Sequence, residues 1–228
     1  HELRSPMTSI QGFVQGMEDG TIPPEEHPRY LRIVREEARR LTKLIADLLD
    51  LSRMEQESAT PAMADFDINE MIRRALIRRM GDMEEKGLEA EVDFQQEQCY
   101  CWGDADRIEQ VVVNLLDNAL KFTPPGGKIA WQTRAQGKLN LIALKDDGPG
   151  ILPQDQPYIF DRFYKADKAH TAGKGTGLGL SICRRILEAH GQVIRLLPTE
   201  AGAAFEFTLE QGRGKAGRDK AEQEEGKE

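Results

Sequence analysis

Two asparagines and a lysine between Asp104 and Thr123 are the side chains of this sequence best suited to hold a charged ligand. If the stretch is a helix, with about 100° per residue, Asn114, Asn118 and Lys121 share an arc of roughly 60°. An amide oxygen can coordinate Mg²⁺ and a lysine ammonium attracts phosphate, so this set suits a nucleoside triphosphate. Such residues on a helix flank are also commonly just solvated, and the helix alone leaves both readings open.

The other side chains of this stretch form an apolar stripe beside the polar arc. Its members are Ile108, Val111, Val112, Leu115, Ala119 and Phe122. A stripe with this spacing is typical of a helix that packs on a core. We therefore predict a helix over residues 104–123 that packs with one face and presents the polar side chains on the next.

A glycine-rich turn, Lys145–Gly150, follows a predicted strand and adds a candidate ligand contact. The carboxylate of Asp146 can accept a hydrogen bond from an exocyclic amine such as that of adenine. Gly148 and Gly150 allow a flat ligand to approach the backbone closely. A single motif of this kind is also ordinary turn chemistry.

A second glycine-rich turn, Gly175–Leu180, opens an amphipathic helix predicted over residues 181–189. Backbone N–H groups and the positive end of a helix dipole favour an anion at such a position, which indicates phosphate binding. Between the two turns, residues 151–174 are too long for an ordinary connection. They carry aromatic residues among charged ones, and we predict that they form a lid.

The remaining pattern of the second half predicts a domain of mixed helix and strand. Alternating apolar residues predict strands over 88–94, 100–102, 128–133, 138–144, 193–197 and 204–209, the third and fourth forming a hairpin. Asp67 or Asn69 can cap a helix that runs to about Lys86. Residues 211–228 are charged and nearly free of apolar side chains, which predicts a disordered tail.

The N-terminal part, up to about Glu57, predicts two helices. Apolar residues recur at heptad spacing over 3–17 and again over 31–48, and the second seam includes Leu41, Ile45 and Leu48. Two such helices expose too much apolar surface for one chain, so we expect two copies to form a four-helix bundle. His1 lies off the seam. A histidine there is usually a plain exposed side chain, but with Glu2 beside it the imidazole can also be a nucleophile.

Composition limits the classes of function. The 228 residues carry a net charge of −8, with 39% hydrophobic and 31% charged residues. The negative charge argues against general nucleic-acid binding, which needs a basic surface. No apolar run approaches the roughly 20 residues of a membrane helix, so we expect a cytoplasmic segment. Cys99, Cys101 and Cys183 lack metal-ligand spacing, which favours reduced structural thiols.

The order of the motifs resembles that of the sensor histidine kinases. HELRSP begins a helical hairpin, NLLDNALKF lies on a helix, DDGPGI follows a strand, IFDRFY lies in the lid and GTGLGLSI opens a helix. The resemblance covers roughly residues 1–210. It implies an α+β protein, in which a helical hairpin forming a dimeric four-helix bundle precedes an α/β sandwich ATP-binding domain of the gyrase and histidine kinase type.

The resemblance also implies domain boundaries. The dimerisation and histidine phosphotransfer domain would occupy residues 1–58 and be truncated at its N-terminus. A linker over 59–65 would join it to a catalytic ATP-binding domain over 66–210, and 211–228 would be the tail.

Individual roles follow from the same resemblance. His1 would accept the phosphoryl group, and Glu2 would orient its imidazole. Asp146 would bind the amine of adenine, and Asn118 would coordinate the Mg²⁺ that accompanies ATP. The other residues implied to contact or shape the nucleotide site are Asn114, Lys121, Phe122, Gly148, Gly150, Arg162, Lys165, Gly175, Thr176, Gly177, Leu178 and Gly179.

Three positions depart from the patterns of related proteins. Lys165 stands where many relatives carry an arginine, so it keeps the charge but loses the bidentate fork, and Arg162 could compensate. Ser5 stands where a threonine or asparagine helps relatives to dephosphorylate their partner, and its hydroxyl could support a phosphatase activity. Asn114 replaces the glutamate that activates water in gyrase-like ATPases, which favours transfer to histidine over hydrolysis.

We therefore predict an ATP-dependent protein-histidine kinase of a two-component system. It would autophosphorylate His1, pass the phosphoryl group to an aspartate of a response-regulator receiver domain, and form a homodimer through the hairpin. The parent protein would be anchored in the bacterial plasma membrane through segments absent from this chain. A gyrase-like ATPase and an inactive nucleotide-binding scaffold are the alternatives. The HELRSP motif argues against the first, and intact His1, Asn118 and Asp146 argue against the second.

Overall fold

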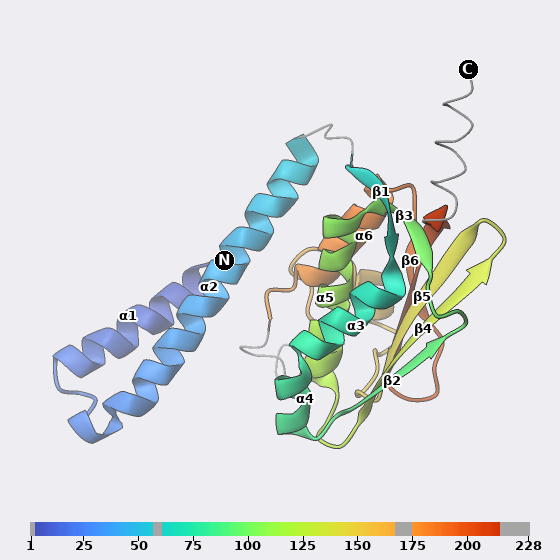
Figure 1. The fold of residues 1–228 in the computed structure, drawn as a ribbon. Helices are drawn as coiled ribbons and strands as arrows, with labels where there is room; N and C mark the ends of the chain where they lie inside the picture. The colour runs from blue at the N-terminus through green and yellow to red at the C-terminus, as the bar shows by residue number, and fades with distance from the viewer. Residues whose placement is uncertain (1–2, 57–60, 167–174, 215–228) are drawn as a thin grey trace. The chain divides into compact units, whose positions relative to one another are not determined.

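The computed structural model describes residues 3–56, 61–166 and 175–214 (Figure 1). His1 and Glu2 therefore lie outside the described residues, as does most of the predicted tail. The chain divides into two compact units, one made of residues 1–58 with 161–179 and the other of the remaining residues. None of the helices in the described ranges is long and apolar enough to cross a membrane.

The first unit is built on a hairpin of two helices. Helices α1 (Arg4–Glu18) and α2 (His27–Gln56) are joined by a turn that contains the short 3-10 helix η1 (Pro24–Glu26). The rings of Phe13 and Tyr30 pack across the hairpin with centroids 5.2 Å apart. The two helices predicted at the N-terminus are thus confirmed over the described residues.

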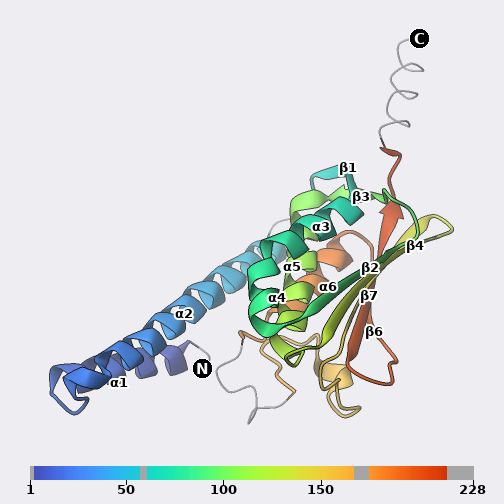
Figure 2. The ribbon, with the colours of Figure 1, turned by 60° about the horizontal axis from the view of Figure 1, so that its bottom comes forward.

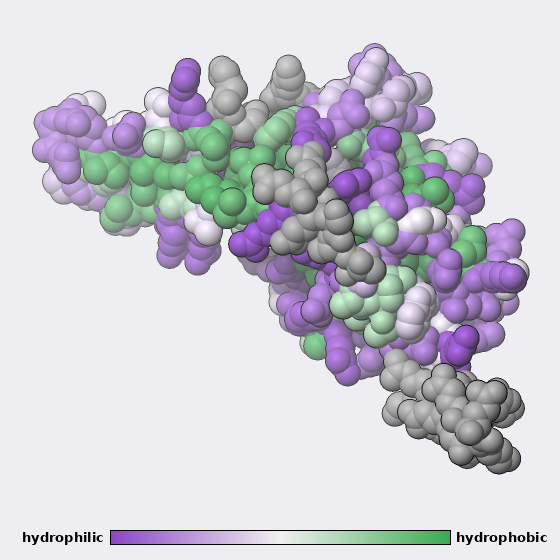
Figure 3. All heavy atoms as spheres, turned by 90° about the horizontal axis from the view of Figure 1, so that it is seen from above, coloured by the Kyte–Doolittle hydropathy of each residue, from purple (hydrophilic) through white to green (hydrophobic). Residues whose placement is uncertain are grey.

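The hairpin leaves much of its apolar surface uncovered. Leu44 is fully buried, whereas Met7, Leu31 and Ile45 are 48%, 53% and 45% exposed. Figure 3 shows apolar side chains gathered in a band along the hairpin. Ile45 belongs to the predicted seam and Leu44 does not, so the face buried within one chain is not the predicted seam. That seam remains available to a second helical partner.

The second unit is a seven-stranded sheet with the order β1-β3-β7-β5-β4-β2, in which β6 also pairs with β7. Strand β2 runs parallel to β4, and the other pairs are antiparallel. The strands are β1 (Met63–Asp67), β2 (Glu89–Phe94), β3 (Tyr100–Asp104), β4 (Lys128–Gln136), β5 (Leu139–Asp146), β6 (Ile194–Leu197) and β7 (Ala203–Gln211).

Helices cover one face of this sheet (Figure 2). They are α3 (Ile68–Arg78), α4 (Met80–Lys86), α5 (Ala105–Phe122) and α6 (Gly179–Ala189). The short 3-10 helix η2 (Gln156–Tyr158) lies in the long segment after β5. Trp131 and Phe207 from the sheet are fully buried, as are apolar residues of α5, so a continuous apolar core lies between the sheet and the helices.

Helix α5 forms because its sequence contains both a cap and a regular apolar stripe. The Oδ1 atom of Asp104 accepts a hydrogen bond from the backbone N of Arg107 at 3.2 Å, which satisfies a free donor in the first turn. The stripe from Ile108 to Ala119 is buried. The predicted helix over 104–123 is confirmed to within one residue at each end.

Three features of this unit differ from the sequence prediction. The helix expected to run to Lys86 is interrupted at Arg79, which separates α3 from α4. Strand β1 was not predicted, and it begins inside the segment expected to be a linker. The start of the predicted tail is ordered, because β7 includes Gln211 and the backbone N of Arg213 donates to Oδ1 of Asp65 at 2.9 Å.

Candidate nucleotide-binding site

The polar face of α5 forms as the sequence predicted. Asn114, Asn118 and Lys121 are all half-buried on this helix. The Nζ atom of Lys121 lies 4.2 Å from the centroid of the Phe122 ring, which is a favourable cation–π distance. Phe122 itself is 37% exposed, so its assignment to the buried stripe was wrong. Its ring lies at the end of the helix, next to the polar side chains.

Asn114 carries a polar atom without a protein partner. Its Nδ2 is buried and makes no hydrogen bond to any described residue. The side chain lies beside the thiol of Cys183, whose pKa burial raises to about 12 while Asn114 opposes the rise. The contact falls short of a hydrogen bond, because Nδ2 meets no partner at hydrogen-bond geometry. An unsatisfied buried amide is unusual in a folded protein, and a phosphate oxygen could satisfy it.

Asp146, at the end of β5, is 6% exposed and is held by two backbone amides. Its Oδ1 accepts hydrogen bonds from the N atoms of Gly148 at 2.8 Å and Ala203 at 3.3 Å. Both bonds reach the same oxygen, so Oδ2 is the atom that can accept a further hydrogen bond. Burial raises the pKa of this carboxyl, and the two amides oppose the rise.

Close backbone packing fixes the position of Asp146. A Cβ atom added to Gly202 would lie 1.6 Å from the carbonyl oxygen of Asp146, and Gly202 has a φ of +72°. Only glycine fits this position. A Cβ on Gly148 would meet Oδ1 of Asp146 at 2.6 Å and the carbonyl oxygen of Phe122 at 3.4 Å. The structure therefore brings the end of α5 next to the aspartate turn.

The loop before β7 contributes two residues that were not predicted from the sequence. Gly202 and the amide of Ala203 hold Asp146, although they lie far from it in the sequence. The glycine next to a predicted strand was the available signal, since an isolated glycine there often marks a close backbone approach. Nothing in the sequence says which backbone approaches it.

The predicted lid segment is divided between the two units: residues 151–160 belong to the second unit and the residues from Asp161 on belong to the first. The backbone N of Phe163 donates to the carbonyl oxygen of Gly177 at 2.9 Å, and Phe163 has a positive φ of 62°. A Cβ on Gly177 would lie 2.9 Å from the Phe163 backbone. This contact joins the lid segment at Phe163 to the glycine-rich turn that follows it, while residues 167–174 lie outside the described residues. Arg162 is exposed and Lys165 is half-buried.

The contacts and burial of Thr176 and Leu178 do not fit a simple phosphate-binding role. The hydroxyl of Thr176 donates to Oδ2 of Asp47 at 3.0 Å and accepts from the backbone N of Leu178 at 3.3 Å. Thr176 is 6% exposed and Leu178 is fully buried. The Thr176 side chain is thus used within the first unit. Gly175 and Gly179 flank them, and Gly179 is the first residue of α6.

The donor set fits Mg²⁺ bound together with phosphate. The described residues contain no group of three or more histidine, cysteine, aspartate or glutamate side chains able to hold a metal ion. Mg²⁺ commonly keeps several waters and takes one or two protein oxygens plus substrate phosphates. The amide oxygen of Asn118 can supply such a ligand from the polar face of α5.

Comparison with known proteins agrees with this arrangement. Residues 103–213 match the family described as histidine kinase-, DNA gyrase B-, and HSP90-like ATPase. Residues 1–57 match the His Kinase A (phospho-acceptor) domain. The chain belongs to the sensor histidine kinases. The resemblance and the fold class predicted from the motifs are thereby confirmed.

Individual relatives of this kinase family cover nearly all of the chain. Sensor protein SrrB of Staphylococcus aureus is 36% identical over 211 residues, which are 92% of this chain but 36% of that protein. The histidine kinase AdeS of Acinetobacter baumannii is 27% identical with a TM-score of 0.76, over 93% of this chain and 98% of its own. The histidine kinase ThkA, solved in complex with the response regulator protein TrrA, is 28% identical with a TM-score of 0.79, over 94% and 60%.

Proposed function

We propose that this sensor histidine kinase core transfers the γ-phosphoryl group of ATP to His1. From there the phosphoryl group would pass to an aspartate in the receiver domain of a response regulator. One observation carries the nucleotide half of this proposal. A buried carboxylate, Asp146, is fixed by two backbone amides at the end of the helix that carries Asn114 and Asn118.

The chemistry of these side chains suits ATP. Oδ2 of Asp146 would accept a hydrogen bond from the exocyclic amine of adenine. The Nδ2 of Asn114 and the ammonium of Lys121 would bind phosphate oxygens, and Asn118 would supply an oxygen to Mg²⁺. The bound ion would neutralise charge on the phosphates. Phosphoryl transfer depends mainly on such positioning and charge neutralisation, so the site needs little other covalent machinery.

The nucleophile would be the unprotonated ring nitrogen of His1, with Glu2 orienting the imidazole. This nitrogen would attack the γ-phosphorus in line with the bond to the β–γ bridging oxygen. That bond would break and ADP would leave. Arg162 and Lys165 would add positive charge near the γ-phosphate, and the exposed hydroxyl of Ser5, in the first turn of α1, could orient water for phosphatase activity.

The uncovered apolar band of the hairpin supports a homodimer. Residues such as Leu31 and Ile45 are too exposed for stable helices in water unless a partner covers them. ThkA has been solved with a response regulator, which supports a partner of that class for this chain. Membrane attachment of the parent protein, through segments outside this sequence, stays a prediction.

The decisive experiment is incubation with γ-labelled ATP and Mg²⁺ of the wild type and of His1→Gln, each extended upstream by a few helical turns. We expect acid-labile, base-stable label on the wild type alone, with equal nucleotide affinity in both proteins. Label on both proteins would show that a residue other than His1 accepts the phosphoryl group. Nucleotide binding without label on either protein would contradict the kinase proposal and favour an ATPase or a nucleotide-binding scaffold.

A further inference from the structure

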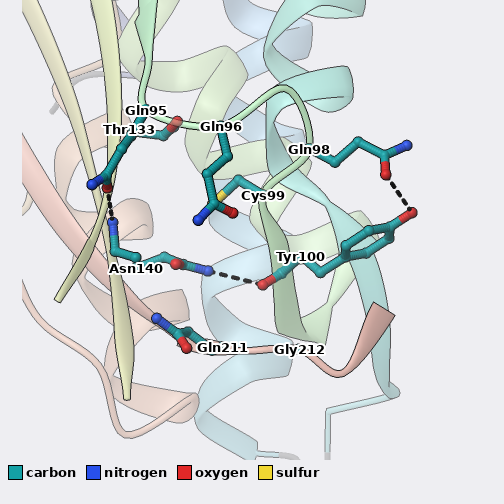
Figure 4. A pocket seen from close by; sticks show the side chains of 10 residues that line it. Gln95, Gln96, Gln98, Cys99, Tyr100, Thr133, Asn140, Gln211 and Gly212 are labelled. Carbon is teal, nitrogen blue, oxygen red and sulfur yellow. Dashed lines mark hydrogen bonds between the residues drawn. The ribbon is translucent and has the colours of Figure 1, made fainter. Parts of the chain in front are cut away.

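A polar cavity lies at the opposite end of β5 from Asp146. It has a volume of about 230 Å³, and its lining comes from residues 95–100, from β4 and β5, and from the end of β7 with the residue after it. Figure 4 shows the cavity with the side chains that line it. None of them belongs to the candidate nucleotide site, so the cavity is a separate feature of the sheet domain.

The buried part of the lining is polar. Thr133 is 1% exposed and Asn140 is 3% exposed. The Nδ2 of Asn140 donates hydrogen bonds to the carbonyl oxygen of Tyr100 at 2.8 Å and to Sγ of Cys101 at 3.2 Å. Its Oδ1 accepts no hydrogen bond from any residue that the structure describes. An unpaired acceptor in such a place costs free energy, so an occupant of the cavity that donates to Oδ1 would be stabilised.

The exposed part of the lining is rich in glutamine. Its glutamines are Gln95, Gln96, Gln98 and Gln211. In Figure 4 the carboxamides of Gln96 and Gln211 lie on either side of that of Asn140. Oε1 of Gln95 accepts from the backbone N of Ala135 at 2.8 Å, which leaves its amino group as a donor. Nε2 of Gln211 donates to the carbonyl oxygen of Leu139 at 3.3 Å, which leaves its Oε1 as an acceptor.

A buried asparagine, Asn69, fixes the loop that carries three of these glutamines, residues 95–98. Asn69 is fully buried, and its Nδ2 donates to the carbonyl oxygens of Gln96 at 2.9 Å and Glu97 at 3.3 Å. Its Oδ1 accepts from the hydroxyl of Thr133 at 2.8 Å. One side chain thus ties the loop to β4. The exposed and buried parts of the lining are therefore held together before any ligand binds, which lowers the cost of binding.

The chemistry of the lining favours a ligand that is neutral and polar. Among the described residues that line the cavity none is charged, so nothing there would neutralise a charged ligand. Only Ala135 is aliphatic, so an apolar ligand would bury little apolar surface. The carboxamides present both donors and acceptors. A hydroxyl group is also both, so a molecule with several neighbouring hydroxyls can pair with both kinds of group at once.

The size of the cavity suits more than a single water molecule. A water occupies about 30 Å³ in the liquid, far less than the volume of this cavity. We propose that the cavity binds a small neutral polyhydroxy molecule, a monosaccharide or a cyclic polyol. One hydroxyl of the ligand donates to Oδ1 of Asn140, and neighbouring hydroxyls pair with the carboxamides of Gln96 and Gln211. The site is independent of the nucleotide and would exist in the chain without ATP.

A titration of the whole chain, followed by the NMR shifts of its backbone amides, tests the proposal. The probes are glucose and myo-inositol, an uncharged ring with a hydroxyl on every carbon, and the matched control is cyclohexanol, the same ring with a single hydroxyl. We expect saturable shifts at Gln96, Asn140 and Gly212 with myo-inositol, and none with cyclohexanol. Equal shifts with cyclohexanol would mean an apolar site and overturn the proposal. So would the absence of saturable shifts with both myo-inositol and glucose.

Variants locate the ligand. Gln96→Ala removes an exposed side chain that makes no hydrogen bond to a described residue, so the fold should not change. We expect affinity for myo-inositol to fall about 3- to 10-fold, the loss of one neutral hydrogen bond. Gln132→Ala, on β4 outside the cavity, is the control and should bind as the wild type. Asn140→Ala should lose saturable binding. Unchanged affinity in Gln96→Ala, or an equal loss in Gln132→Ala, would contradict binding in this cavity.

A third probe separates polyols from the other class of neutral polar ligand, the amides. N-acetylglycinamide carries amide donors and acceptors but no hydroxyl. We expect it to bind more weakly than myo-inositol, because each of its polar groups is only a donor or only an acceptor at a given atom. Tighter binding of N-acetylglycinamide than of myo-inositol and glucose would assign the cavity to peptide-like ligands, and the polyol proposal would be wrong.

Discussion

The helical hairpin and the sheet domain differ in how completely they bury their apolar side chains. The sheet domain encloses its own core, with Trp131 and Phe207 fully buried between sheet and helices. The hairpin buries Leu44 but leaves Leu31 and Ile45 about half exposed. From this difference we expect the sheet domain to be stable within one chain, and a second copy to stabilise the hairpin.

The largest effect is expected from Trp131→Ala in the sheet domain. Its Nε1 has no hydrogen-bond partner among the described residues, so the loss is one of packing. We expect the free energy of unfolding of this domain to fall by about 3–5 kcal/mol, measured by urea denaturation. The other tryptophan, Trp102, is 39% exposed, and Trp102→Ala should cost about 1 kcal/mol or less. Equal losses would argue against a self-contained core around Trp131.

Asp146→Asn should weaken nucleotide binding without unfolding the domain. A hydrogen bond to a charged group contributes about 1.5–3 kcal/mol, so we expect affinity for ATP to fall about 10- to 100-fold in calorimetric titration. Asp147→Asn removes the same charge one residue away and should leave affinity close to that of the wild type. A similar loss in both variants would assign the effect to net charge rather than to a hydrogen bond.

On the hairpin, Ile45→Glu should weaken the association of two copies into a dimer. A charge placed in an apolar interface costs about 1–3 kcal/mol, so the dimer dissociation constant should rise roughly 10- to 100-fold in analytical ultracentrifugation. Ile45→Leu keeps the apolar bulk and should dimerise normally. If Ile45→Glu stays dimeric, another face of the hairpin forms the interface and the predicted seam is wrong.

The smallest effect is expected from pH. The pKa of Asp146 lies above the ordinary 3.8, so its acceptor oxygen is lost as pH falls through that raised value, and ATP affinity should decline a few-fold in mild acid. The folded state binds this proton more tightly than the unfolded state, so the same carboxyl lowers stability as pH rises through that window. Asp146→Asn should bind ATP with a flatter pH profile. An equal acid decline in that variant would place the titrating group elsewhere.

Local patterns were enough to predict most helices and strands. The apolar stripe and the cap of α5 specify a helix, and the face beside the stripe carries Asn114, Asn118 and Lys121. This could be predicted because the 3.6-residue period of a helix can be read directly from residue spacing. The hairpin of β4 and β5 was predicted in the same way and is confirmed, with each strand slightly longer. Strand β1 escaped prediction because it depends on pairing with β3 rather than on a pattern of its own.

The family, the helices and the residue types of the candidate nucleotide site follow from spacing along the chain. The surroundings of those residues depend on contacts between segments far apart in the sequence. The amide of Ala203 reaches Asp146 because β5 and β7 pair in a register that places the two residues opposite each other. That register depends on contacts between segments far apart in the sequence. The same holds for Cys101, which Asn140 contacts from another strand. Burial, pKa shifts and cavities arise from such non-local contacts, so spacing along the sequence does not reveal them.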